Sequence, residues 1–338
     1  MEKGPEIRIV GGASAEKKEK AKKEVAQALF NHFESLSPHE REQFEKFEYP
    51  KSEKELALIS FANEETSRLM QEAGIEPYDV PIDNFHIVPP ELYKKATGRG
   101  GTATTFNAKQ GIIFDAQHFR DNPVNFGAVA LHELLHLKAH FSVEVQEEGG
   151  KTEKTNYREG VTIRALQRYG HHGKYHHHFE GLHEGIVAET EKRLLGRLLD
   201  RPELAKEKEW LTSDEAKEMR KKIAVEKEIP EDDIIWIGKK GKDDWKTFSY
   251  LRQRDVLNYV CAEIQKQFPD EYQSADDVYK TFLNAHFTGR LLPLARIVEK
   301  TFGEGNFRLL GNMDTDRQSG VLHLESLKKA RMRQMREK

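Results

Sequence analysis

The clearest hydrophobic pattern of the chain runs through residues 122–141. Apolar side chains recur there at the three- and four-residue spacing of one helical face, at Val124, Ala128, Leu131 and Leu135. Asn122 is a good helix cap, and Pro123 fits the first helical position because it has no amide proton to leave unpaired. The pattern therefore predicts a helix that begins at Pro123 and turns an apolar face to the core.

Short runs of β-branched and aromatic residues on both sides of this helix predict strands. Residues 83–89 form one such run between prolines, and residues 102–116 form two runs around the turn residues NAKQG. Beyond the helix, residues 141–146 and 156–166 are separated by the polar stretch EEGGKTEKT, which predicts a second hairpin. We expect a small mixed sheet packed on the helix.

Most of the remaining chain has a helical pattern. Residues 13–37 form a charged helix with lysine and glutamate at helical spacing, and residues 179–199 carry apolar positions along one face. From Trp245 onward the pattern is again helical. We expect an α+β fold with these parts: 1–48, a charged helical N-terminal extension; 49–200, the domain with the sheet and the central helix; 201–313, a helical C-terminal lobe; 314–338, a flexible basic tail.

Composition narrows the partners and the chemistry. A formal net charge of -3 over 338 residues gives no overall attraction to nucleic acid, so we expect no nucleic-acid partner, the basic tail included. Apolar runs such as LLPLA are far shorter than the ~20 residues of a membrane span, and the N-terminus has no signal-peptide core, so we expect a cytoplasmic protein without a membrane partner. The single Cys261 excludes a multi-cysteine zinc site, which leaves histidine and carboxylate as metal ligands.

Two histidines and a glutamate in the predicted helix have the spacing of a catalytic metal site. His132 and His136 in ALHELLHLKAH are four residues apart, so both imidazoles lie on one face and can bind one ion. Glu133 lies about 100° farther round the helix, where a general base can take a proton from water. With 15 histidines in the chain, random order produces this motif on the order of once in fifteen such chains. Its mid-helix position after a hairpin favours a zinc site.

A catalytic zinc ion needs a third protein ligand and an open position for water. His140 cannot share an ion with His132, because eight residues span ~12 Å along a straight helix. Two glutamates remain as the main candidates, Glu159 in NYREGVTI and Glu184 in GLHEGIVAE.

The order of these motifs resembles that of a known family. ALHELLHLKAH, then YREGV, then FEGLHEGIVAETEKRL are similar to motifs of the thermolysin-like zinc peptidases called gluzincins, in particular their compact bacterial minigluzincin relatives. The resemblance covers roughly residues 56–199. It implies that Glu184 is the third ligand and that Glu159 lies on the strand between the two helices. Glu180 and Glu189 are lesser alternatives.

The resemblance implies a zinc-dependent peptidase that acts on a peptide or protein substrate, with Zn2+ as cofactor and Glu133 as general base. The chain departs from the family at His183, where asparagine is usual, and at Glu189, which follows Glu184 by five positions instead of four. An extended substrate would add to a sheet edge formed by TATTFN or GIIFDA. The alternative function is that of a non-catalytic, zinc-stabilised interaction protein that retains the fold.

Two further groups are candidates for supporting roles. Tyr250 and Arg254 lie one turn apart in SYLRQRDVL and are the expected hydrogen-bond donors to an oxyanion, with Tyr157 and Arg158 as second choices. The stretch 171–178 holds five histidines. We interpret it as a solvated loop, in preference to an accessory metal site or a pH-sensitive lid.

Overall fold

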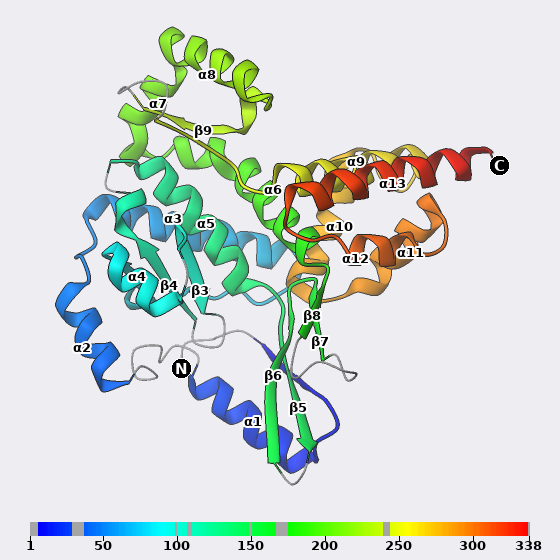
Figure 1. The fold of residues 1–338 in the computed structure, drawn as a ribbon, viewed down its shortest axis with the longest axis horizontal. Coiled ribbons are helices and arrows are strands. Elements are labelled where there is room, and N and C mark those ends of the chain that lie inside the picture. The colour runs from blue at the N-terminus through cyan, green and yellow to red at the C-terminus, as the bar shows by residue number, and fades with distance from the viewer. Residues whose placement is uncertain are drawn as a thin grey trace.

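The fold is α+β, as the sequence predicts, and consists mainly of helices with small sheets between them (Figure 1). Among the described helices, none combines the length and the apolar character that crossing a bilayer requires. The computed structural model describes residues 6–28, 37–98, 100–106, 110–119, 121–148, 151–166, 175–238 and 244–336.

A three-stranded mixed sheet lies beside the central helix. It consists of β2 (Phe85–Val88), β3 (Ala103–Phe106) and β4 (Gly111–Asp115), so the strands predicted in this region are confirmed. The central strand β4 pairs in parallel with β2 and antiparallel with β3. Because β4 uses both of its edges, β3 is an outer strand of this sheet.

The strand β4 separates two layers of apolar side chains. Ile112 and Phe114 belong to the main core, whereas Ile113 between them packs with residues of α2 (Pro38–Phe47) and α4 (Pro90–Thr97). Successive side chains of a strand point to opposite faces, so β4 is buried on both sides.

The central helix α5 (Pro123–Lys138) begins where the sequence predicts. The Asn122 side chain accepts a hydrogen bond from the amide of Asn125, and Pro123 opens the first turn. The helix packs against β3 and two long helices, α3 (Glu53–Glu72) and α6 (Glu180–Leu199). Its side chains are buried almost all round, which places the helix in the middle of the main core.

A five-stranded sheet follows α5, with strand order β1-β5-β6-β7-β8. The predicted second hairpin is present as β5 and β6, which pair antiparallel. Its bounds differ from the prediction, because most of the polar stretch 147–155 belongs to these two strands and the predicted strand 156–166 is divided between β6 and β7. Before them in the chain, β1 pairs in parallel with β5, and this pairing has no signal in the sequence pattern. The strands have these bounds: β1 (Ile7–Val10), β5 (Phe141–Glu148), β6 (Lys151–Glu159), β7 (Thr162–Leu166) and β8 (Tyr175–His178).

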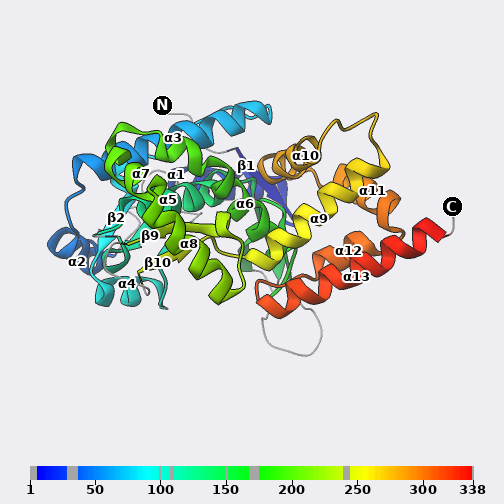
Figure 2. The ribbon, with the colours of Figure 1, turned by 90° about the horizontal axis from the view of Figure 1, so that it is seen from above.

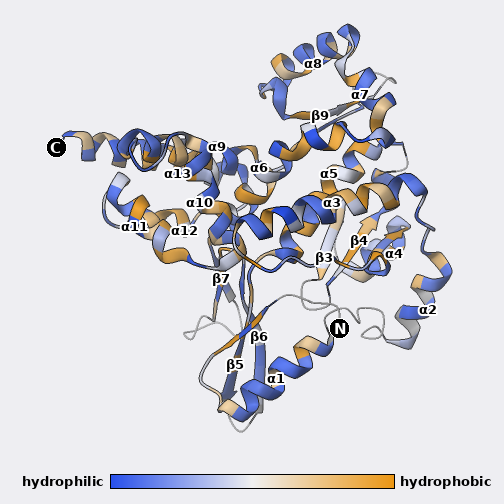
Figure 3. Ribbon diagram, turned by 180° about the vertical axis from the view of Figure 1, so that it is seen from behind, coloured by the Kyte–Doolittle hydropathy of each residue, from blue (hydrophilic) through white to orange (hydrophobic). Residues whose placement is uncertain are grey.

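The charged N-terminal helix α1 (Ala15–Ala28) lies on this second sheet. Most of the helix is hydrophilic (Figure 3), but Ala21 is buried against Phe141, Val143 and Val145 of β5. A small separate core therefore joins the N-terminal segment to the hairpin.

The chain after α6 forms two groups of elements, one within residues 205–247 and the other within residues 251–336. Figure 2 shows α9 to α13 together at one end of the molecule. The bounds are α7 (Ala205–Thr212), α8 (Asp214–Lys227), β9 (Ile234–Ile237), β10 (Trp245–Thr247), α9 (Leu251–Gln267), α10 (Ala275–Thr288), α11 (Leu291–Phe302), α12 (Asn306–Gly311) and α13 (Arg317–Arg336).

The C-terminal segment differs from the flexible tail that its basic sequence predicts. Residues 317–336 form the helix α13, which packs against α9. Leu327 and Ala330 are buried, and Arg331 donates hydrogen bonds to Glu263 and to Gln267 of α9. Apolar residues three positions apart lie on one face of a helix, which gives this segment a side that can be buried.

A buried ion pair links α9 to the turn before β9. Arg254 and Asp233 are both almost fully buried, and the guanidinium donates two hydrogen bonds of 3.1 and 2.7 Å to the carboxylate. Lys192 of α6 reaches the same carboxylate at 2.6 Å. The pair therefore fixes α9 and α6 relative to each other.

Replacing Asp233 by Ala should lower the free energy of unfolding by about 3–5 kcal/mol, because the Arg254 charge would remain buried without its partner. Chemical denaturation measures this change. Asp232→Ala is the matched control: this side chain also bonds Lys192 but is 72% exposed, so the cost should stay within about 0.5 kcal/mol. Equal losses in the two variants would contradict the assigned role of the ion pair.

Candidate metal centre

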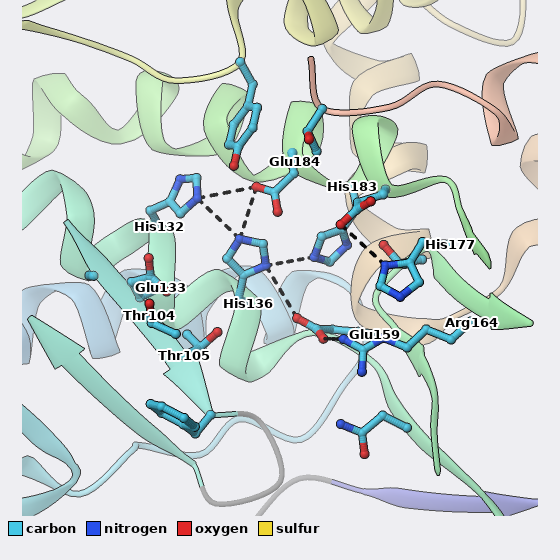
Figure 4. A pocket seen from close by; sticks show the side chains of 17 residues that line it. Thr104, Thr105, His132, Glu133, His136, Glu159, Arg164, His177, His183 and Glu184 are labelled. Carbon is cyan, nitrogen blue, oxygen red and sulfur yellow. Dashed lines mark hydrogen bonds and ion pairs between the residues drawn. The ribbon is translucent and has the colours of Figure 1, made fainter. Parts of the chain in front are cut away.

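His132 and His136 direct one ring nitrogen each to the same point beside α5 (Figure 4). The distance between their Nε2 atoms is 3.3 Å. His136 is buried and His132 is partly buried. The four-residue spacing on one helix thus brings the two imidazoles together, as expected from the sequence.

Glu184 comes to the two histidines from α6, which packs along α5. Its Oε2 atom lies 3.4 Å from Nε2 of His136 and 3.6 Å from Nε2 of His132. This oxygen is buried and has no hydrogen-bond partner among the described residues. An unpartnered buried carboxylate oxygen between two imidazoles is the arrangement that a bound cation would satisfy.

The separations of these three atoms fit a tetrahedral metal ion. Ligands at about 2.0–2.1 Å from zinc, at tetrahedral angles, are about 3.3–3.4 Å apart. The three atom pairs here are 3.3, 3.4 and 3.6 Å apart. His132, His136 and Glu184 could therefore hold one divalent cation together.

The carboxylates and imidazoles of this group shift each other's pKa values. Burial opposes protonation of His132, but the nearby carboxylates of Glu184 and Glu191 favour the protonated ring, outweigh burial and raise the pKa of His132 well above its ordinary value. The pKa of His136 is also raised, because Glu184 overcomes the effect of burial. Burial disfavours the charged carboxylate of Glu184, but the two histidines hold its pKa well below the usual range.

Glu191 orients His132 from behind. Its Oε2 atom lies 3.0 Å from Nδ1 of His132, and its side chain is almost fully buried. Seven residues are close to two turns of helix, so Glu191 lies on the same face of α6 as Glu184. The sequence analysis names Glu189 as the carboxylate that follows Glu184, and it does not identify Glu191. The i+7 spacing from Glu184 is the signal that identifies Glu191.

Glu189 instead belongs to the structural contacts between helices. Its carboxylate accepts hydrogen bonds from Arg193 at 3.0 Å and from Asn258 of α9 at 3.3 Å. Five residues from Glu184 correspond to a rotation of about 500°, which turns Glu189 away from the histidines. Its carboxylate is therefore committed to α9, and the structure does not bring it to the metal ligands.

The other ring nitrogen of His136 faces a second group. Nδ1 of His136 lies 2.8 Å from Nε2 of His183 and 3.7 Å from Oε1 of Glu159. These three residues could also hold a cation by distance alone. If each of the two groups held an ion, His136 would bind metal through both ring nitrogens and would keep no ring proton. With a single ion at Nε2, the Nδ1 atom keeps its proton and can donate it to His183. Glu159 also lies 3.5 Å from Arg164, on the side of His136 away from Glu184.

A cavity of about 610 Å³ opens in front of the three candidate ligands. Glu133 lines it, and burial raises the pKa of this carboxylate. The strand β3 lines it as well. Of the two sheet edges that the sequence proposes for a substrate, the one formed by GIIFDA is central strand β4 and is already paired on both sides, so only TATTFN remains.

Of the two residues expected to donate to an oxyanion, Tyr250 lies at the cavity and Arg254 does not. Tyr250 lines the cavity, with its ring 6.2 Å from that of His132 and nearly parallel to it. It caps α9 with φ at 55°, a left-handed conformation that a tyrosine rarely adopts. Arg254, one turn later, points into the protein and is bound to Asp233, so the prediction that it donates to an oxyanion is wrong.

The second choices for that role are not at the cavity. Neither Tyr157 nor Arg158 is among the described residues that line it. Arg158 donates a hydrogen bond to the carbonyl of Gly289 instead, at 2.6 Å. The pairing of β6 with β5 shifts its register between Asn156 and Arg158, so regular alternation is interrupted there, and Asn156 and Glu159 are the residues of β6 that line the cavity.

The histidine-rich stretch is described only in part. His176, His177 and His178 belong to the strand β8, so the interpretation of a solvated loop is wrong for this part of the stretch. Of these three, His177 lines the cavity, 3.5 Å from Glu180. Residues 167–174, with the first two histidines of the stretch, lie outside the described residues. Glu180 therefore lies at the rim of the cavity with His177, apart from the candidate ligand group of His132, His136 and Glu184.

Zinc should bind with one ion per chain and stabilise the fold. At 100 times its dissociation constant, zinc should raise the free energy of unfolding by about 2.7 kcal/mol. Because the pKa values of His132 and His136 are raised, these imidazoles hold their protons more firmly than a free histidine, so zinc must compete with protons and its affinity should fall as pH decreases. Calorimetry in buffers of different ionisation enthalpy counts the released protons.

Two variants separate the two possible cation groups. Glu184→Ala should abolish zinc binding, whereas Glu159→Gln should keep one ion per chain. Two ions in the native protein, reduced to one in Glu159→Gln, would show that the second group binds metal and would contradict the assignment above.

Comparison with protein-family models, curated proteins and solved structures finds no match to this chain. The chemical interpretation of the centre therefore rests on the residues and distances described above.

Proposed function

We propose that the protein is a zinc-dependent peptidase of the gluzincin type, similar to the compact minigluzincins. The observation that supports it most is the triangle of ligand atoms from His132, His136 and Glu184, with separations of 3.3 to 3.6 Å. A tetrahedral zinc ion bound there by three protein atoms keeps one position for water or substrate.

A bound zinc ion would supply Lewis acidity, which polarises an amide carbonyl and lowers the pKa of water. The chain supplies the proton transfers. Glu133 is the only glutamate of α5 and lines the cavity next to both histidines, so it takes the proton from the attacking water and passes it to the leaving amine. Its raised pKa favours the protonated form that the second transfer needs.

The cavity is suited to an extended peptide. The outer strand β3 lines it over Ala103–Phe106, and a peptide chain can add to such an edge by backbone hydrogen bonds. Tyr250 lies on the side of His132 and donates its hydroxyl proton to the oxyanion that develops during attack. The left-handed backbone of Tyr250 holds this ring at the cavity.

Glu133→Gln should keep zinc and lower cleavage about 10²–10⁴-fold, because the amide cannot accept the proton. Zinc content and the cleavage of a proteome-derived peptide library, read by mass spectrometry, measure the two properties. Glu144→Gln, on β5 away from the cavity, is the control. If the zinc-loaded native protein cleaves nothing in the library, the interaction-protein alternative replaces the peptidase.

Tyr250→Phe should lower kcat about 10²–10³-fold with little change in KM, since the hydroxyl acts on the developing charge and not on the bound substrate. Steady-state kinetics on a peptide found in the library gives both constants. Tyr259→Phe is the matched control, because Tyr259 lies on the same helix α9 and packs on Phe302. An unchanged kcat in Tyr250→Phe would exclude the tyrosine as oxyanion donor.

A further inference from the structure

Three buried histidines from three helices lie in a row behind the candidate metal centre. His136 on α5 contacts His183 on α6, and His183 contacts His286 on α10. The ring centroids are 4.8 and 5.0 Å apart. His286 then reaches back to α5, where its Nε2 atom lies 3.1 Å from the carbonyl oxygen of Leu135. The row therefore begins and ends on neighbouring residues of one helix.

The far end of the row fixes the position of one proton. A carbonyl oxygen only accepts hydrogen bonds, so Nε2 of His286 carries the proton that it donates to Leu135. Burial lowers the pKa of His286 to about 3, so the ring is neutral. Its Nδ1 atom consequently has a free lone pair and can act only as an acceptor.

The near end fixes a second proton. When Nε2 of His136 faces a cation, the proton of this ring is on Nδ1, which donates to Nε2 of His183 at 2.8 Å. The accepting Nε2 atom of His183 carries no proton, and an imidazole with one bare nitrogen is the neutral ring. Nε2 of His183 accepts, and its proton is therefore on Nδ1.

The Nδ1 atoms of His183 and His286 border one small space beside Gly160. Nδ1 of His183 and Nδ1 of His286 are both buried, and neither has a hydrogen-bond partner among the described residues. A Cβ atom on Gly160 would lie 2.5 Å from the first and 2.9 Å from the second, so both nitrogens border the same space. The first is a donor and the second an acceptor, which are the two partners that one water can bridge.

We propose that His183 is a positioning residue of the metal centre, at the middle of a hydrogen-bonded relay that holds Nε2 of His136 toward the cation. The relay runs from His136 through His183 and one buried water beside Gly160 to His286 and the carbonyl of Leu135. It rests on the proposed metal centre. Partners of this kind fix the tautomer and the ring orientation of a ligating histidine.

Gly160 is the residue that leaves room for this relay. Its φ of +55° is in the left-handed region, and any side chain would collide with the two imidazoles. Its backbone amide donates to the carbonyl of His140, which holds the turn between β6 and β7 against the end of α5. The C-terminal lobe, through His286 of α10, thereby contributes to the environment of a ligand on α5.

The tautomers can be observed directly in the zinc-loaded protein. Two-bond proton–nitrogen correlation spectra of histidine labelled with nitrogen-15 distinguish the protonated ring nitrogen from the bare one. We expect the proton on Nδ1 in His136 and His183, and on Nε2 in His286. A proton on Nε2 of His183, or a charged His183 ring, would overturn the relay. This measurement uses the native chain, so it does not depend on whether a variant folds.

Zinc affinity gives a second readout. His183→Ala should weaken zinc binding about 10–100-fold, and His183→Asn should restore most of it, because the amide oxygen can accept from Nδ1 of His136. His286→Ala should weaken binding in the native chain but add nothing in His183→Ala, where the relay is already broken. His140→Ala, a partly buried histidine outside the row, is the control and should change affinity less than twofold.

The outcomes separate this inference from the proposed function. Unchanged zinc affinity in His183→Ala, or equal losses in His183→Ala and His183→Asn, would reject the relay while leaving the metal centre and the peptidase in place. A native protein that binds no zinc would reject the metal centre and the relay together.

Discussion

Burial of one carboxylate oxygen of Glu184 against two imidazoles is the interaction on which the rest of the centre depends. A buried carboxylate is stable only where positive charge replaces its lost hydration, and here that charge comes from His132 and His136 or from a cation between the three. The helices α5 and α6 must therefore pack closely. Gly127 of α5 permits this, because a Cβ atom there would lie 2.8 Å from Leu198 of α6.

The position of α6 is set by the C-terminal half of the chain. At its start, the amide of Gly181 donates to the carbonyl of Met313, and there is no room for a side chain beside this contact. Farther along, Lys192 reaches the Asp233 carboxylate that also binds Arg254 of α9. Elements far from α5 in the sequence thus decide where the third candidate ligand lies, and removing their contacts would loosen the centre without touching a ligand.

Local spacing was enough to predict the half of the site that lies on one helix. The 3.6-residue repeat places His132 and His136 on one face and Glu133 beside it, and the cap at Asn122 fixes where the helix begins. The strands and the hairpin were predictable for a similar reason, since alternation and turn residues are also local signals. Only the resemblance of its motif favoured Glu184 over Glu159 as the third ligand, because nothing local connects either glutamate with α5.

Contacts between distant segments were decided by the tertiary structure alone. Glu191, and not Glu189, faces His132, because Glu191 shares with Glu184 the face of α6 that packs against α5. Arg254 binds Asp233 and does not reach the cavity, although it lies one turn from Tyr250, because its buried charge requires a carboxylate partner. The sequence by itself determined the elements and the paired histidines through short-range periodicity. Which side chains meet across helices depends on how those elements pack, and periodicity carries no information about that.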